Sequence, residues 1–495
     1  MRRFTGQAGR PRVRASFLAV GGAALSAAIS LCAVAAPVAH AEGSSLKGSS
    51  VGSSVVTRPV VAPGEVDPFY DTSTVTPVRE GEILRTQQAS YSGIFGDAAL
   101  ALPDSVDKIM YTTRDASGAL TPVTGYVLEP AVPWRGEGER PTVVIVRGTV
   151  GQGDHCAPSR NWPLDGQPDP VNTGRFVNLE GLYDMVFADQ GIRVVVTDLV
   201  GMGTQGTHTY MNRDDQAHAM LDAARAARTL VESRGGRFGQ VGLYGHSQGG
   251  GASAAAAEAQ PTYAPDINLA AAYASAPPAD LDEVQRNIDG SDLVGAIGFT
   301  INGLLARYPS LAPIIEANVT PEGKDVLTRV SQMCTNDIME EFGFQNTRQW
   351  ITGERSLTEL TRAFPETKAA MDDQVIGTGR PRVPVMIVSG PYDRNVAYGQ
   401  AKHLAQTWCA KGVDVVYRDD FLPELGALGE YNHVAQAVSG GSFGIPFIVN
   451  AFYGRGPAAG TTCTNFNGNT GSSVADSSSA LSSMPLSSGL MSSMP

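Results

Sequence analysis

A six-residue motif constrains the fold of this 495-residue chain more than any other feature. Residues 245–250 read GHSQGG, which contains the pattern G-x-S-x-G. The largely apolar segment 240–244 before it predicts a short strand, and the Ala-rich segment 251–259 after it predicts a helix. A strand, a tight turn and a helix are the context of a nucleophile elbow, in which flanking glycines allow close backbone approach. The motif therefore predicts an α/β protein with Ser247 raised above a sheet edge.

Apolar runs elsewhere in the chain alternate between strand-like and helix-like segments. Further strands are predicted at 108–114, 120–128, 142–146, 191–197, 268–273, 384–388 and 413–417. Helices are predicted at 213–231 and 396–410, and residues 115–118 are typical of a hairpin turn. Strands that alternate with helices predict a mostly parallel, doubly wound sheet with helices on both faces.

The alternation is interrupted between residues 279 and 380, where no convincing strand is found. Helices are predicted there at 293–308, 326–342 and 357–364, so the segment is interpreted as a helical cap inserted into the sheet topology. Its first part carries little charge. Two interpretations stay open and are compatible: helices that pack on the core, or a hydrophobic lid over an acyl pocket. The candidate acyl-pocket and lid residues are Leu293, Ile297, Ile301, Leu304 and Leu305.

The N-terminal residues 1–41 have the composition of a signal peptide. Five arginines precede an apolar stretch of small residues, and the segment ends in the cleavage pattern Ala39-His40-Ala41. A membrane anchor is the alternative, but the Ala/Gly/Ser-rich stretch and the cleavage pattern argue against it. No other stretch is long and apolar enough to span a bilayer. The sequence therefore predicts a secreted or envelope-associated protein with no transmembrane segment in its mature form.

Composition also predicts the domain boundaries. Residues 42–66 are predicted to be a linker, and residues 464–495 a disordered Ser-rich tail. The α/β core is expected in two parts, 67–278 and 381–463, on either side of the cap at 279–380.

Charge and cysteine content limit the partners and cofactors. The chain carries a formal net charge of −12, which becomes about −17 without the five N-terminal arginines, and this disfavours binding to nucleic acid. Four cysteines lie outside the signal peptide, and in an exported protein they predict two disulfides with three alternative pairings. The chain has no CxxC motif and no Cys/His cluster, so we expect no metal site, and catalysis by a serine nucleophile would need no cofactor.

A serine hydroxyl needs a base to become a nucleophile at neutral pH. On a sheet with this elbow the acid and then the histidine follow the serine along the chain. Beyond the elbow only His403 and His433 qualify, since His155, His208 and His218 precede Ser247. We expect His403 on a solvated face of the helix at 396–410, whereas His433 lies in a predicted loop after the last strand. His433 is therefore the predicted base.

The acid should follow a strand and precede His433. Asp393 stands in the loop after the strand at 384–388, where its carboxylate could orient and stabilise the imidazole. Asp419 and Asp420, after the next strand, are the alternatives. An oxyanion would need two N–H donors. We expect one from Gln248, directly after the nucleophile, and the second from the loop after the strand at 142–146, with Thr149 preferred over Gly151.

These motifs together resemble the secretory lipases of the α/β-hydrolase superfamily, the group that includes Candida antarctica lipase A, and especially its actinobacterial members. The resemblance covers about residues 65–463, and its most specific element is the Cys-Ala-Pro-Ser sequence at 156–159. It implies an α/β-hydrolase fold with a helical cap and a catalytic triad of Ser247, Asp393 and His433. It also implies disulfides that pair Cys156 with Cys334 and Cys409 with Cys463. Gln248 departs from the glycine of fungal members, although its backbone N–H can still donate.

The leading functional hypothesis is an exported triacylglycerol lipase or carboxylesterase that acts through an acyl-enzyme, with a lipid or ester substrate at an oil–water or envelope interface. Acyl transfer among cell-envelope lipids is the second hypothesis, since it would use the same acyl-enzyme with an alcohol acceptor. A non-catalytic lipid-binding protein is a third hypothesis, which the complete set of triad candidates disfavours. The sequence leaves the acyl chain length and the oligomeric state open.

Overall fold

The computed structural model of the chain describes residues 67–92, 103–164, 180–426, 431–456 and 463. The predicted signal peptide (1–41), linker (42–66) and Ser-rich tail (464–495) lie outside the described residues. Among the described helices, none combines the length and apolar character that a membrane-spanning segment needs.

The described strands form one nine-stranded sheet in the order β1-β2-β3-β5-β4-β6-β7-β8-β9. Their bounds are β1 (Ile83–Ala89), β2 (Pro103–Arg114), β3 (Leu120–Pro130), β4 (Thr142–Val146), β5 (Arg193–Thr197), β6 (Val241–His246), β7 (Leu269–Ser275), β8 (Val385–Ser389) and β9 (Val415–Asp419). The pairs from β1 to β3 and between β3 and β5 are antiparallel. The pairs from β5 through β4 to β9 are all parallel.

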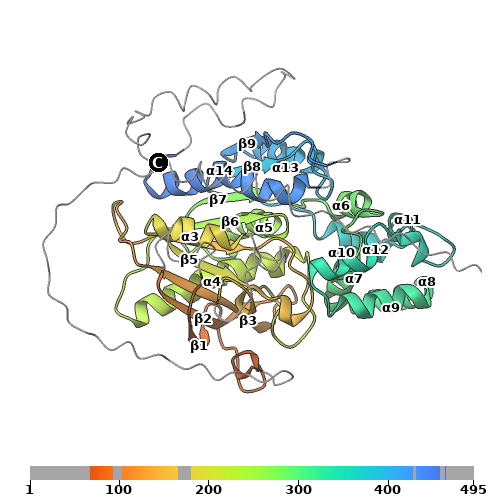
Figure 1. Ribbon diagram of the computed structural model, residues 1–495, viewed down its shortest axis with the longest axis horizontal. Coiled ribbons are helices and arrows are strands. Elements are labelled where there is room, and N and C mark those ends of the chain that lie inside the picture. Colours follow the sequence, from red (N-terminus) through yellow and green to blue (C-terminus); the bar gives the residue numbers. More distant parts are fainter. Residues whose placement is uncertain (1–66, 93–102, 165–179, 427–430, 457–462, 464–495) are drawn as a thin grey trace, which may run out of the picture.

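Helices cover both faces of the sheet (Figure 1). One face packs against α4 (Arg213–Ser233), α5 (Gln248–Tyr263) and α13 (Tyr398–Ala410). The other face packs against α3 (Gly181–Asp189) and α14 (Asn432–Phe452). The fully buried strand β4 shows why, because its β-branched side chains alternate between two separate apolar clusters and so bind helices on each side. The predicted mostly parallel α/β fold is confirmed.

A group of helices lies between β7 and β8 and gathers at one end of the molecule (Figure 1). Its members are α6 (Leu281–Ile288), α7 (Ala296–Arg307), α8 (Ala312–Asn318), α9 (Pro321–Val330), α10 (Thr335–Phe342), α11 (Leu357–Ala363) and α12 (Pro365–Asp372). Their apolar side chains form a cluster of their own, joined by Tyr210 and Met211 from the sheet domain. We refer to this group as the helical cap; it falls inside the predicted range 279–380.

The prediction of a single helix over residues 326–342 is wrong. The structure has two helices there, α9 and α10, because residues 333–335 leave the helical path and pair with the loop after β4. In this pairing Gln152 N–H donates to Met333 O (3.0 Å) and Thr335 N–H donates to Val150 O (2.9 Å). This long-range pairing overrides the local helical pattern.

The sequence-based prediction also missed several elements, namely strand β1 and helices α3, α6, α8, α12 and α14. The omission of α14 matters most, since His433 lies in its first turn and not in a loop as predicted. Its Gly- and Ser-containing sequence lacks a clear start signal, and Tyr431 at the N-cap position makes no side-chain capping bond.

The cysteines are paired as the family resemblance implies. Cys156 is bonded to Cys334, which joins the loop after β4 to the start of α10 in the cap. Cys409 on α13 is bonded to Cys463. Arg307 on α7 adds two ion pairs between the cap and the sheet domain, to Asp115 (2.9 Å) and Asp215 (2.6 Å).

We predict that replacing both Cys409 and Cys463 by serine lowers the free energy of unfolding by about 2–4 kcal/mol, since the bond restricts the unfolded chain. Urea denaturation followed by circular dichroism measures the change. Non-reducing peptide mapping of the wild type is the control and should recover Cys409 linked to Cys463. An unchanged urea midpoint, or a Cys156–Cys409 peptide, contradicts the assignment.

Candidate active site

Ser247 occupies a sharp turn between β6 and α5. Its backbone has φ 57° and ψ −121°, a conformation that a residue with a side chain adopts only when its surroundings enforce it. The surroundings are the neighbouring strand β4 and the backbone of the turn itself. A Cβ on Gly249 would lie 1.9 Å from Val146 O of β4, and one on Gly245 would lie 2.2 Å from Gly249 backbone atoms. Only glycine permits this approach, which presents the Ser247 hydroxyl at the carboxyl end of the sheet.

The structure brings Ser247, His433 and Asp393 together from three elements. His433 Nε2 lies 2.8 Å from Ser247 Oγ, and His433 Nδ1 lies 2.8 Å from Asp393 Oδ2. Asp393 Oδ1 accepts hydrogen bonds from the backbone N–H groups of Asn395 (2.8 Å) and Val396 (2.9 Å). All three side chains of the set are buried. Backbone N–H groups therefore hold one carboxylate oxygen in place, and the other oxygen orients the imidazole.

The charge environment favours a proton on His433. Burial opposes that proton, but the carboxylate of Asp393, its hydrogen bond and the charge of Glu180 together raise the pKa of His433 above its ordinary value. The neighbouring ring of His246, 4.7 Å away between centroids, has a pKa lowered by burial and by His433. His246 Nδ1 lies 3.0 Å from Ser275 Oγ, so this ring is a neutral support for the turn.

The alternative acids and base lie elsewhere. Asp419 accepts a hydrogen bond from Tyr398 OH (2.5 Å), and Asp420 accepts one from Ser439 Oγ (3.0 Å). His403 is exposed on α13. Geometry therefore favours Asp393 and His433 over these three residues.

The backbone N–H of Gln248 follows Ser247 directly at the start of α5, and among the described residues no main-chain hydrogen bond engages the N–H of Thr149. Thr149 follows Gly148, whose Cβ position is 3.7 Å from Ser247 Cβ. Gly151, the other candidate, instead lies against the disulfide, since a Cβ there would be 2.6 Å from Cys334 Cα. The geometry thus favours Thr149 over Gly151 as the second donor.

The Gln248 side chain belongs to a buried network that the sequence did not suggest. Its Nε2 lies 3.0 Å from His208 Nε2, and His208 Nδ1 lies 2.9 Å from Val200 O. Burial lowers the pKa of His208 to about 4, so it is neutral and accepts from Gln248. Gln152 Nε2 donates to the main-chain oxygens of His208 (2.9 Å) and of Phe299 (3.1 Å) on α7. The residue after Ser247 is thereby connected to the cap.

The last residue of the Cys-Ala-Pro-Ser sequence, Ser159, ties this loop to the sheet. Its backbone N–H donates to Asp198 Oδ1 (2.8 Å), and its hydroxyl donates to the same carboxylate. Asp198 follows β5, the neighbour of β4 in the sheet. The loop that carries Thr149 is thus anchored to the sheet at residue 159 and to the cap at Cys156.

A small apolar cavity of about 20 Å³, room for about one water molecule, lies between the cap and the sheet domain. Its lining residues are Tyr210, Met211, Leu281, Val284, Gln285, Ile288, Ala296, Ile297 and Thr300. Tyr210 also lies 2.7 Å from Thr149, hydroxyl to hydroxyl, and so connects the cavity to the loop beside Ser247.

Of the five residues predicted to form an acyl pocket, only Ile297 lines this cavity. Leu304 is buried in the apolar cluster of the cap, and the partly buried Leu293, Ile301 and Leu305 pack against that cluster. The low charge of this helix therefore reflects its packing inside the cap, and the cavity is completed by α6, which was not predicted as a helix.

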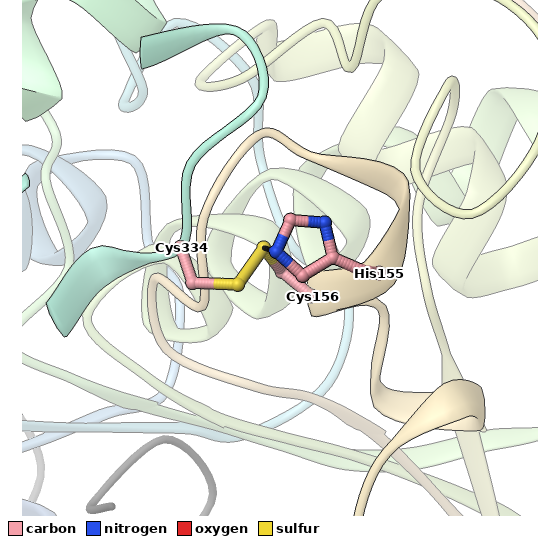
Figure 2. A group of neighbouring side chains, drawn as sticks. All are labelled: His155, Cys156 and Cys334. Atoms are coloured by element: carbon pink, nitrogen blue, oxygen red, sulfur yellow. Dashed lines mark hydrogen bonds between the residues drawn. A yellow bond between two sulfur atoms is a disulfide. The ribbon is translucent and has the colours of Figure 1, made fainter. Parts of the chain in front are cut away.

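Figure 2 shows the group of described side chains that comes nearest to a metal-ligand set, namely His155, Cys156 and Cys334. The two sulfur atoms are joined to each other in the disulfide, so they are not available as thiolate ligands. His155 Nε2 lies 3.8 Å from Cys156 Sγ. The group is interpreted as part of the covalent link between the loop and the cap.

Comparison with known proteins gives consistent similarities. The sequence profile of the secretory lipase family matches residues 172–460. A protein of Mycobacterium tuberculosis described as a probable inactive lipase is 29% identical over 210 residues, which are 42% of this chain and 46% of that protein. The secreted triacylglycerol lipase LIP4 of Malassezia globosa is 23% identical, over 70% of this chain and 74% of its own.

Among solved structures, the closed state of Candida antarctica lipase A superposes with a TM-score of 0.64. The match covers 79% of this chain and 86% of that chain at 20% sequence identity. At this identity the likeness concerns the fold, which is that of the α/β-hydrolases.

We predict that Gly249→Ala destabilises the protein by about 3 kcal/mol or more, because the added Cβ would overlap Val146 O and force α5 away from β4. Gly399→Ala on α13 is the matched control, since a Cβ there has no neighbour within 4 Å. Urea denaturation of both variants measures the difference. Equal unfolding midpoints would mean that the close contact at Gly249 is not needed.

Proposed function

The chain belongs to the secretory lipase family, and from this we propose that it hydrolyses carboxylic esters of lipids, such as acylglycerols, through an acyl-enzyme formed on Ser247. The observation that carries the proposal is the hydrogen-bonded series from Ser247 Oγ through His433 to Asp393. A serine, a histidine and a carboxylate in this arrangement are the parts needed for acyl transfer.

In the proposed acylation step Ser247 Oγ attacks the ester carbonyl carbon while His433 Nε2 accepts the hydroxyl proton. Asp393 stabilises the imidazolium that forms, and the N–H groups of Gln248 and Thr149 donate to the oxyanion. Collapse of this intermediate breaks the bond to the alcohol, which leaves with the proton from His433. Water, activated by the same imidazole, then attacks the acyl-enzyme and releases the carboxylic acid.

The cavity at Tyr210 and Ile297 is the proposed site of the acyl chain. Its walls are mostly apolar, and each buried methylene group of a substrate would contribute about 0.8 kcal/mol to binding. The hydroxyl of Tyr210, which lines the cavity, is hydrogen-bonded to the hydroxyl of Thr149, the candidate oxyanion donor. The cavity therefore lies next to the candidate oxyanion position. On this proposal the small cavity widens when the acyl chain enters, and a substrate with an extended acyl chain is preferred over a short ester.

The cellular location forms part of the proposal. Relatives such as LIP4 are named as secreted lipases, and two disulfides suit an oxidising compartment. We infer that residues 1–41 act as the signal peptide for export.

Two alternative functions remain distinguishable by experiment. Acyl transfer to an alcohol of a cell-envelope lipid would use the same acyl-enzyme and would appear as a transferred product when an alcohol acceptor is added. A non-catalytic role is suggested by the name of the mycobacterial relative. The hydrogen-bonded set at Ser247 argues against that role here, since it is complete and buried.

We predict that Ser247→Ala and His433→Ala each lower kcat for p-nitrophenyl butyrate by about 10³–10⁶ fold, because either change removes a part of the nucleophile and base pair. His403→Ala is the matched control and should retain wild-type turnover, since His403 is exposed on α13. Purified variants are compared by initial rates and by circular dichroism. Wild-type turnover by a folded Ser247→Ala variant refutes the proposed mechanism.

We further predict that Thr300→Trp reduces activity on C12 to C18 esters at least about tenfold relative to acetate esters, because the indole would fill the cavity. Ala306→Trp, at an exposed position on the same helix, is the control. The measurement is kcat/KM across a series of p-nitrophenyl esters. An equal loss at every chain length would place the acyl chain elsewhere.

A further inference from the structure

Glu180 is a half-buried acid of the active-site region that the proposed mechanism does not use. It occupies the N-cap position of α3. Its Oε2 accepts a hydrogen bond from the backbone N–H of Gly148 (2.9 Å), and its main-chain oxygen accepts one from Arg147 Nη1 (2.5 Å). Both partners come directly after β4, at the start of the loop that carries Thr149.

Gly148 lies close to both this carboxyl group and the nucleophile. A Cβ on Gly148 would be 3.1 Å from Glu180 Oε1 and 3.7 Å from Ser247 Cβ. The carboxyl group and the serine thus approach the same glycine. Because Glu180 binds the Gly148 amide, it restricts the peptide plane that precedes the Thr149 amide.

Several ionisable groups face Glu180. Burial raises its pKa to about 7, while Arg147, the Gly148 N–H and His433 favour its charged form and Asp184 opposes it. Arg147 is itself engaged by Asp184 in a buried ion pair with a 2.7 Å contact. The buried phenols of Tyr244 and Tyr273 also experience its charge.

Glu180 and His433 each favour the charged form of the other. The groups that act on the His433 ring are Asp393, Glu180 and Asp292, which favour its protonated form, and the neutral ring of His246. Among the acids, Asp393 contacts the ring directly, whereas no hydrogen bond joins Glu180 to it in the described structure. The negative charge of Glu180 is one of the causes that raise the pKa of His433.

We propose that Glu180 is a positioning residue of the active site, whose carboxylate holds the Gly148 amide in place and whose charge stabilises protonated His433. The inference rests on the proposed function, since it assigns His433 the role of base. Loss of the negative charge makes it easier for His433 to lose its proton, so the imidazole becomes a free base at lower pH. The same charge stabilises the imidazolium that forms when Ser247 is deprotonated.

The test is the pH dependence of kcat/KM for p-nitrophenyl butyrate in the wild type, Glu180→Gln and Glu180→Ala. Glutamine removes the charge but keeps an oxygen that can accept from Gly148. We expect its acidic limb to move to lower pH by about 0.5–1 unit. Alanine removes the acceptor as well and should lower the plateau of kcat/KM by a further factor of about ten. Asp189→Asn, a charge removal at the other end of α3, should leave the profile unchanged.

A second readout does not depend on turnover. NMR titration of histidine-labelled protein in the Ser247→Ala background, with His433 assigned from a His433→Ala sample, should show the same downward shift on Glu180→Gln. An unchanged or raised His433 titration midpoint in the folded glutamine variant overturns the proposal for Glu180. Absence of ester hydrolysis in the wild type would instead overturn the proposed function, and the NMR titration would still decide whether Glu180 acts on His433.

Discussion

The structure depends on one close backbone approach. The first turn of α5 packs directly against the carboxyl ends of β4 and β7. Gly249 lies against Val146 O, and a Cβ on Gly250 would lie 2.2 Å from Ser275 O. Ser247 N–H donates to Ser275 O (2.9 Å), which fixes the turn to β7. This contact brings the nucleophile beside the loop after β4, at the position where neighbouring strands of an α/β sheet diverge into loops and binding sites form.

The loop after β4 is shared between the sheet domain and the cap. Asp198 holds it through Ser159, while the cap holds it through Cys334 and through Thr335, whose hydroxyl donates to Thr149 O (2.8 Å). A donor for an oxyanion must be preorganised, because reorientation during the reaction would cost free energy. The covalent and hydrogen-bonded attachment to the cap supplies this rigidity. It also means that a movement of the cap at α10 would displace the candidate donor.

Buried charge surrounds the same loop and is compensated locally. Arg147 and Asp184 form an ion pair with almost no exposed surface, and Tyr126 donates to the same carboxylate (2.5 Å). Removing one partner of such a pair leaves an uncompensated charge, so the network is expected to be intolerant of single substitutions. Glu180 forms no ion pair among the described residues, and it approaches the same glycine, Gly148, as Ser247 does.

The sequence by itself determined the elements with strong local patterns. The run Thr142–Val146 is a strand because its β-branched residues are buried on both faces, and GHSQGG forms the turn because only glycines allow that approach. Chain order and elimination also led to Asp393 and His433, which the structure brings to Ser247. Only the tertiary structure decided that His433 begins a helix, that residues 333–335 pair with the β4 loop, and that Glu180 lies beside the nucleophile. Each of these depends on contacts between distant segments, which outweigh the weak propensities of the local sequence.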